Sequence, residues 1–225
     1  MAKGKTLWEM LMAKLQGPVE LHYYNPLKAK IGSSIMINEI DLRDYNFFIK
    51  EIRQYQRWID GQQFLFVDYV LLARPLHGDD VWLRLRLNPV DDPEAAAGLT
   101  HTALLLRLYD EMAYDDGLYK VVTDTTKLFQ VIENGQVTEE YGRINNVTTS
   151  YKAKLSILKD ENKDGQVDEG EVKKENLEYW DYWRDTTDPV GQPVRQYLFV
   201  EMNSDSGWFQ IWRGQEIDPQ KVLVI

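Results

Sequence analysis

Cysteine is absent from the 225 residues of this chain. The sequence therefore excludes disulfides, thiolate chemistry and every zinc site that depends on cysteine, and it fits a reducing compartment. Histidine is scarce as well. His22, His77 and His101 lie far apart and show no metal-ligand spacing, so we expect no histidine-based zinc site.

Long apolar runs and basic clusters are also missing. No segment approaches the roughly 20 apolar residues of a membrane-spanning helix, and Glu9 and Lys14 interrupt the apolar residues near the amino terminus before a secretory signal develops. The formal net charge of −10 disfavours broad attachment to nucleic acid or to an anionic membrane. These features predict a soluble, cytoplasmic protein without a transmembrane segment.

A short amphipathic helix is expected within residues 1–17. Thr6 and Glu9 occupy capping-box positions, and Gly17 and Pro18 end the segment. Its apolar side chains fall on one helical stripe, formed by Leu7, Trp8, Leu11, Met12 and Leu15. We interpret it as a helix packed on the core or on a partner, because it lacks the strongly basic face of a membrane anchor.

The rest of the chain is predicted to be mainly β. Short runs of β-branched and aromatic residues alternate with frequent turn residues, and hairpin turns are expected at Asp60-Gly61, Asp116-Gly117 and Asn134-Gly135. The expected strands are Ser34–Ile40, Phe47–Arg53, Gln63–Ala73, Val81–Leu87, Ala103–Tyr109, Leu118–Val122, Leu128–Glu133, Ser150–Leu158, Tyr179–Arg184, Tyr197–Met202 and Trp208–Arg213.

Two segments of the chain resemble each other. Gln63–Asp68 and Gln196–Glu201 match in residue type at each position, and each is followed by a glycine turn and a tryptophan, Trp82 or Trp208. We interpret the match as an internal duplication of a β-meander. The alternative is that strands of similar burial have converged on similar apolar patterns.

A linker candidate divides the chain between these segments. Asn88–Leu99 contains two prolines, two adjacent aspartates and three alanines. We therefore expect two β-meander, sandwich or barrel-like units, at residues 18–90 and 91–225, after the amino-terminal helix.

The twelve residues Asp160–Glu171 have the spacing of a calcium-binding loop. A hard cation such as Ca²⁺ needs six to eight oxygen ligands, so the chain must coil around it, with Gly165 at the sharp bend. The predicted ligands are Asp160, Asn162, Asp164, Gln166 through its backbone carbonyl, Asp168 through a water molecule, and Glu171 with two oxygens. The loop resembles the EF-hand calcium loop over its full length. The alternative is an acidic, solvated loop that binds no metal.

The segments that flank this loop differ from an EF-hand. Tyr151–Ile157 alternates like a half-buried strand where an entering helix is required, and only Val172–Leu177 fits a short exiting helix. The sequence also has no second loop of this kind. We therefore expect a strand–loop–helix insertion with a structural calcium site that relieves repulsion among its acids, rather than a calcium sensor.

Two further functions compete with this interpretation. Trp208 and Trp212 fall on one face of an expected strand, which suits the stacking platform of a carbohydrate-binding module, although burial in sheet packing is more common for such tryptophans. The acid pairs Asp79-Asp80, Asp91-Asp92 and Asp115-Asp116 suggest a carboxylate-based hydrolase, but neighbours on a strand point to opposite faces. No catalytic constellation stands out, so we do not expect an enzyme.

Several segments carry a resemblance to a known family. A glycine-led strand at Ile31–Ile35 is followed by Phe64–Leu71 and then by Trp82-Leu83, and Tyr197–Gly214 repeats the pattern. These segments resemble an uncharacterised bacterial β-rich domain family, relative to which the calcium loop looks like an insertion. The resemblance implies a non-catalytic protein that accompanies phage-shock-type membrane-stress proteins, small membrane proteins and polyamine enzymes. Our leading hypothesis is therefore a calcium-binding adaptor or interaction module for another protein of an envelope-stress system.

Overall fold

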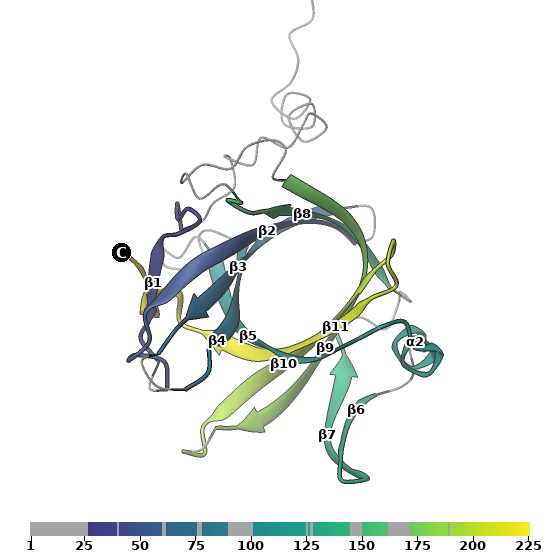
Figure 1. Ribbon diagram of the computed structural model, residues 1–225. Coiled ribbons are helices and arrows are strands. Elements are labelled where there is room, and N and C mark those ends of the chain that lie inside the picture. Colours follow the sequence, from purple (N-terminus) through teal and green to yellow (C-terminus); the bar gives the residue numbers. More distant parts are fainter. Residues whose placement is uncertain are drawn as a thin grey trace, which may run out of the picture.

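A computed structural model describes residues 27–39, 41–59, 62–75, 78–89, 101–124, 126, 128–144, 150–161, 172–188 and 190–225. Within them the chain is mainly β, and its centre is a closed antiparallel barrel of eight strands (Figure 1). In order around the barrel these are β2 (Phe47–Ile59), β3 (Gln62–Ala73), β4 (Val81–Pro89), β5 (His101–Met112), β11 (Phe209–Ile217), β10 (Pro193–Asn203), β9 (Val172–Thr187) and β8 (Tyr151–Leu158). The expected amino-terminal helix and most of the expected linker lie outside the described residues.

Pairing between β8 and β2 closes the barrel. Their register runs from Ile52 opposite Leu158 to Trp58 opposite Lys152, and β8 pairs with β9 on its other side. Closure leaves no free hydrogen-bonding edge among these eight strands. Strands from both expected units, residues 18–90 and 91–225, contribute to this one barrel.

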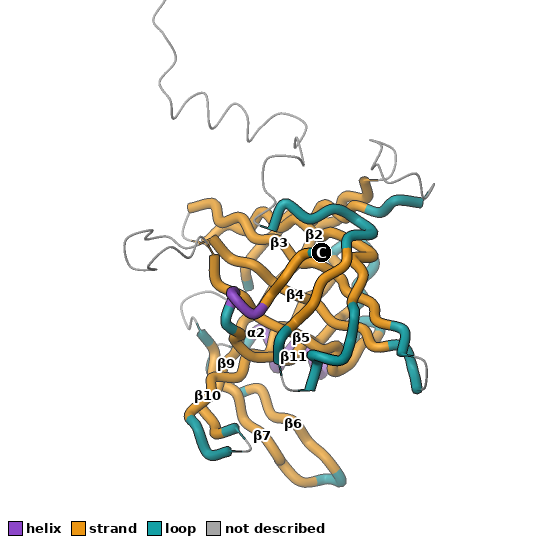
Figure 2. The backbone as a smooth tube through the Cα atoms, turned by 90° about the vertical axis from the view of Figure 1, so that its left-hand side faces the viewer, coloured by secondary structure: helices purple, strands orange, loops and turns teal. Residues whose placement is uncertain are grey.

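Additional elements lie outside the barrel (Figures 1 and 2). They are β1 (Ser34–Ile37), α2 (Asp116–Thr123), β6 (Phe129–Glu133), β7 (Gln136–Arg143), the 3-10 helix η2 (Pro219–Lys221) and β12 (Val222–Val224). One apolar cluster joins β1 and β12 to the outer faces of β2, β3 and β4, and a second joins α2, β6 and β7 to those of β9, β10 and β11. No helix in the described ranges is long and apolar enough to cross a membrane.

The expected strands all form in the structure with one exception. Leu118–Val122 lies in α2, so the prediction of a strand and of a hairpin turn at Asp116-Gly117 is wrong. The carboxylate of Asp115 caps this helix by accepting a hydrogen bond from the backbone N–H of Leu118 at 2.6 Å. The cap fixes the first turn of a helix, which the apolar run alone did not reveal.

The segment after the predicted calcium loop is also different from expectation. Val172–Leu177, expected as a short helix, is the start of β9, because Val172 pairs with Leu158 of β8. The insertion is therefore strand–loop–strand. β7 was not among the expected strands, although the predicted turn at Asn134-Gly135, with φ of 52° and 76°, joins it to β6.

A layer of buried charges crosses the barrel interior. On β4, leucines that join an outer apolar cluster alternate with Arg84 and Arg86, so the arginines point inward. Arg86 forms a bidentate pair with Asp68 of β3, at 2.8 and 2.9 Å. Arg84 donates to both carboxylate oxygens of Glu201 of β10, at 2.8 and 2.9 Å. Because β4 and β10 are not neighbours in the sheet, this contact spans the lumen.

Aromatic side chains complete this charged layer. Arg84 also donates to the Tyr55 hydroxyl at 3.1 Å, and its guanidinium lies 3.6 Å from the centre of the Trp212 ring. The four charged side chains are at most 4% exposed. Removing ions from water costs several kcal/mol each, so the layer is stable only while its charges compensate one another.

Replacing Glu201 tests this compensation. We expect Glu201→Gln to lower the free energy of unfolding by roughly 3–5 kcal/mol, because it leaves a buried positive charge without its partner. Urea unfolding followed by tryptophan fluorescence measures the change. As a control, Asp185→Asn breaks the exposed pair with Arg195, joined at 3.0 Å, and should cost less than about 1 kcal/mol. Equal losses in the two variants would contradict a structural role for the layer.

Acid should weaken the barrel through the same carboxylate. Burial by itself would raise the pKa of Glu201, but the charges of Arg84 and Arg86 and the hydrogen bond from Arg84 bring it below its ordinary value of 4.5. The unfolded chain therefore takes up this proton first, so the stabilisation is complete above about pH 4.5 and is lost as the pH falls through the native pKa. The urea midpoint should drop between about pH 5 and pH 3, and less steeply in Glu201→Gln. Parallel slopes in both proteins would argue against this carboxylate as the source.

Candidate ligand-binding site

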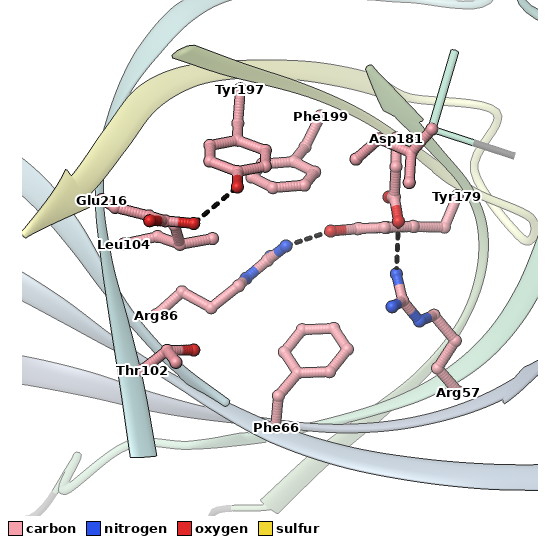
Figure 3. Close-up of a pocket in the computed structure, with 11 residues that line it drawn as sticks. Arg57, Phe66, Arg86, Thr102, Leu104, Tyr179, Asp181, Tyr197, Phe199 and Glu216 are labelled. Atoms are coloured by element: carbon pink, nitrogen blue, oxygen red, sulfur yellow. Dashed lines mark hydrogen bonds and ion pairs between the residues drawn. The ribbon is translucent and has the colours of Figure 1, made fainter. Parts of the chain in front are cut away.

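A cavity of about 200 Å³ opens inside the barrel, next to the charged layer (Figure 3). Every barrel strand except β8 contributes to its wall. The lining residues are Arg57, Phe66, Arg86, Thr102, Leu104, Ile144, Tyr179, Asp181, Tyr197, Phe199 and Glu216. Barrels of eight strands are just wide enough to hold one small ligand in this way.

Arg86 separates the cavity from the charged layer. Its guanidinium lies between the rings of Phe66 and Phe199, at 4.5 and 4.6 Å from their centres, and donates to the hydroxyl of Tyr179 (Figure 3). Burial alone would lower the pKa of Arg86, but the charge of Asp68 raises it well above its ordinary value. Arg86 is therefore a fixed cation whose donors are already directed to protein groups.

Arg57 and Asp181 form a second ion pair in the cavity wall. Arg57 Nη1 donates to Asp181 Oδ2 at 2.7 Å, and the two side chains are 18% and 7% exposed. Burial acts to lower the pKa of Arg57, but the charge of Asp181 raises it overall. Asp181 Oδ1 and Arg57 Nε are buried and have no hydrogen-bond partner among the described residues. Such atoms cost about 1–3 kcal/mol each unless a ligand or water satisfies them.

Tyr197 and Glu216 form the third polar feature of the cavity. The Tyr197 hydroxyl donates to Glu216 Oε1 at 2.6 Å (Figure 3). Burial, followed by this hydrogen bond, raises the pKa of Tyr197 to about 12, so the hydroxyl keeps its proton. The Tyr197 ring stacks on Phe199 with 5.9 Å between centres. These rings give the cavity an apolar wall beside a carboxylate.

The cavity residues escaped sequence analysis because they come from separate strands. The acid pairs singled out there do not form a shared site: Asp80 pairs with exposed Arg74 at 3.4 Å, Asp115 caps α2, and Asp91-Asp92 lies outside the described residues. One local signal was available. The alternation of leucine and arginine over residues 83–87 indicates a strand with a charged face, and both faces of that strand are buried.

Trp208 and Trp212, expected on one face of a strand, are not arranged as a platform. Trp208 precedes β11 and is 44% exposed, whereas Trp212 is 7% exposed inside the barrel, under the guanidinium of Arg84. The alternative of a platform of two open indoles is therefore not realised, and Trp212 follows the preferred interpretation of burial. Trp212 packs in the core, as tryptophans in strands commonly do.

The predicted calcium loop joins β8 to β9. Asp160 is described, whereas the predicted ligands Asn162, Asp164, Gln166, Asp168 and Glu171 lie outside the described residues. Its flanking strands pair up to Leu158 opposite Val172, so the loop is the connection of an antiparallel hairpin. Within the described ranges, no group of three or more histidine, aspartate or glutamate side chains is placed to hold a metal ion. The calcium assignment thus rests on the sequence pattern.

Comparison with known proteins adds no further constraint on the function of this barrel. No protein-family model, no curated protein and no solved structure matches the chain.

Proposed function

We propose that this protein binds a small molecule in the lumen of its barrel and acts as a binding module rather than as an enzyme. The observation that carries the proposal is a cavity of about 200 Å³ whose wall contains buried, unpartnered polar atoms of Asp181 and Arg57. A largely pre-formed cavity with apolar walls and a few convergent polar groups is typical of ligand sites. As the family resemblance implies, the liganded barrel would serve as an interaction module for another protein.

Binding fits the lining residues better than catalysis does. The lining residues that the structure describes include no serine, histidine or lysine that would form a nucleophile and base pair. Two carboxylates, Asp181 and Glu216, do face one cavity, which is the arrangement that a hydrolase requires. One oxygen of Asp181 is already held by Arg57 in an ion pair at 2.7 Å, however, so this carboxylate is not free to act on a substrate as the mechanism requires. We therefore rank hydrolysis second.

Filling the cavity tests the proposal without assuming a ligand. Thr102→Trp adds a large side chain at the cavity wall on β5, so it should abolish the binding of small molecules identified with the wild-type protein. A fragment library screened by ligand-observed NMR supplies those molecules, and circular dichroism checks that the variant is folded.

Leu108→Trp is the matched control for this experiment. Leu108 lies on the same strand, is 42% exposed and does not line the cavity, so the variant should bind the same fragments as the wild type. The proposal fails if the wild type binds no fragment, or if Thr102→Trp retains all of them.

We also propose that the connection between β8 and β9 binds Ca²⁺. The complete oxygen spacing from Asp160 to Glu171 supports this. The described flanks support a structural role, because the loop is preceded and followed by paired strands and not by the two helices whose angle changes in a calcium sensor. The ion would bridge the acidic side chains of this loop, which otherwise repel one another.

Calcium should therefore stabilise the protein without changing its fold. With a dissociation constant of about 10⁻⁴ to 10⁻³ M, 10 mM calcium should raise the free energy of unfolding by roughly 1.5–3 kcal/mol. Isothermal titration and thermal unfolding measure the two quantities. Glu171→Gln removes the bidentate ligand and should abolish both effects, whereas Glu161→Gln, at a non-ligand position of the loop, should preserve them. Absence of calcium binding at millimolar concentration would end this proposal.

A further inference from the structure

We propose that the ligand of the barrel is a small compound with a protonated amine, recognised by Asp181 and Glu216. This inference rests on the proposed ligand-binding function and names the chemical class of the ligand. It follows from the balance of charge in the lumen, from the hydrogen-bonding groups that remain open, and from the size of the cavity.

The arginines of the lumen are already neutralised by protein carboxylates. Arg84 and Arg86 are balanced by Asp68 and Glu201. Arg57 is balanced by Asp181 in the same way. Glu216 has only the neutral Tyr197 hydroxyl as its partner in the part of the chain that the structure describes. Among the charged residues that line the cavity, Glu216 is therefore the one that is not paired with a described cation.

Two carboxylate oxygens of the cavity wall remain open as acceptors. The Asp181 side chain is only 7% exposed, and its Oδ1 accepts no hydrogen bond from the described residues. Glu216 receives one hydrogen bond, on Oε1, so its second oxygen also remains open. An ammonium group carries three donors and no acceptor, which complements an open carboxylate oxygen at either position. Hydrogen bonds of this kind are roughly twice as strong as neutral ones.

An anionic ligand fits the same cavity poorly. The donors of Arg86 are directed to Asp68, Glu201 and Tyr179. Arg57 Nε is an unpartnered donor, but it belongs to a side chain that is paired with Asp181. An anion that approached this nitrogen would meet the negative charge of that carboxylate and of Glu216.

The walls and volume limit the rest of the ligand. Tyr197, Phe199 and Leu104 provide an aromatic and aliphatic surface for a short carbon chain, and an ammonium group is also attracted to the face of a tyrosine ring. The volume of about 200 Å³ corresponds to roughly seven water molecules at about 30 Å³ each. The ligand, or the part of it that enters the barrel, is therefore a short-chain amine.

Three probes of equal length separate the amine from other chemistries. Butylamine, butanol and butyrate differ only in their polar end, and each is titrated at neutral pH into the intact, ¹⁵N-labelled protein. Arginine Nε–H signals and ligand-observed NMR report binding in the barrel. We expect butylamine to bind at least about tenfold more tightly than butanol, and we expect no binding of butyrate over the same concentration range.

A charge-removing variant assigns the effect to the cavity. Glu216→Gln, at an exposed position, should weaken the binding of butylamine about tenfold and leave that of butanol unchanged. Glu133→Gln removes the same charge from an exposed site on β6, outside the barrel, and should change neither affinity. Asp181→Asn is a second test if circular dichroism shows that it folds.

The outcomes distinguish this inference from the proposed function. If butanol or butyrate binds in the barrel as tightly as butylamine, or if Glu216→Gln has no effect on butylamine, the amine class is wrong while ligand binding holds. If none of the three probes binds, the amine class is also wrong. The fragment screen with Thr102→Trp then decides separately whether the barrel binds ligands at all.

Discussion

The pairing of Arg84 and Arg86 with Asp68 and Glu201 is the constraint on which the barrel depends. Four charges lie in its interior, at most 4% exposed, and each needs a partner of opposite sign because desolvation is costly. A shift of β4 by one residue would place leucines in this layer and turn both arginines into an apolar cluster. The layer therefore fixes the register of β4 and ties β3, β4 and β10 together across the lumen.

The same layer determines where a ligand fits and what it meets. Arg86 is held between Phe66 and Phe199, and its donors are used by protein groups, so it closes the inner end of the cavity without attracting an anion. With the deep charges balanced, two peripheral groups set the local potential. These are Asp181, which has one unpartnered oxygen, and Glu216, which has a neutral partner. For the ligand that we propose, a small difference in charge at the cavity would govern recognition.

Alternation and turn residues are local properties, and they predict the β class and nearly all of the strands. The predictions fail where a single contact decides the outcome. The cap at Asp115 made a helix of Leu118–Val122, and pairing with β8 made a strand of the polar segment after Val172. No pattern in the sequence predicts the cavity. Arg57, Asp181 and Glu216 lie on three strands that only barrel closure brings together, and no spacing in the sequence connects them.

The two matching segments, which we interpret as a duplication, hold corresponding positions in the barrel. Asp68 and Glu201 end the two matching segments, and they lie on β3 and β10, which are opposite each other in the order of the eight strands. Both acids point inward, but Asp68 lies opposite Arg86 in the register with β4, whereas Glu201 lies opposite Gln210 in the register with β11. If the halves arose by duplication, one half therefore supplies both cations of the layer. Glu201 must then reach across the lumen for its partner. The contact between Glu201 and Arg84 makes the two halves of the barrel interior different. The cavity therefore has no counterpart related to it by the duplication.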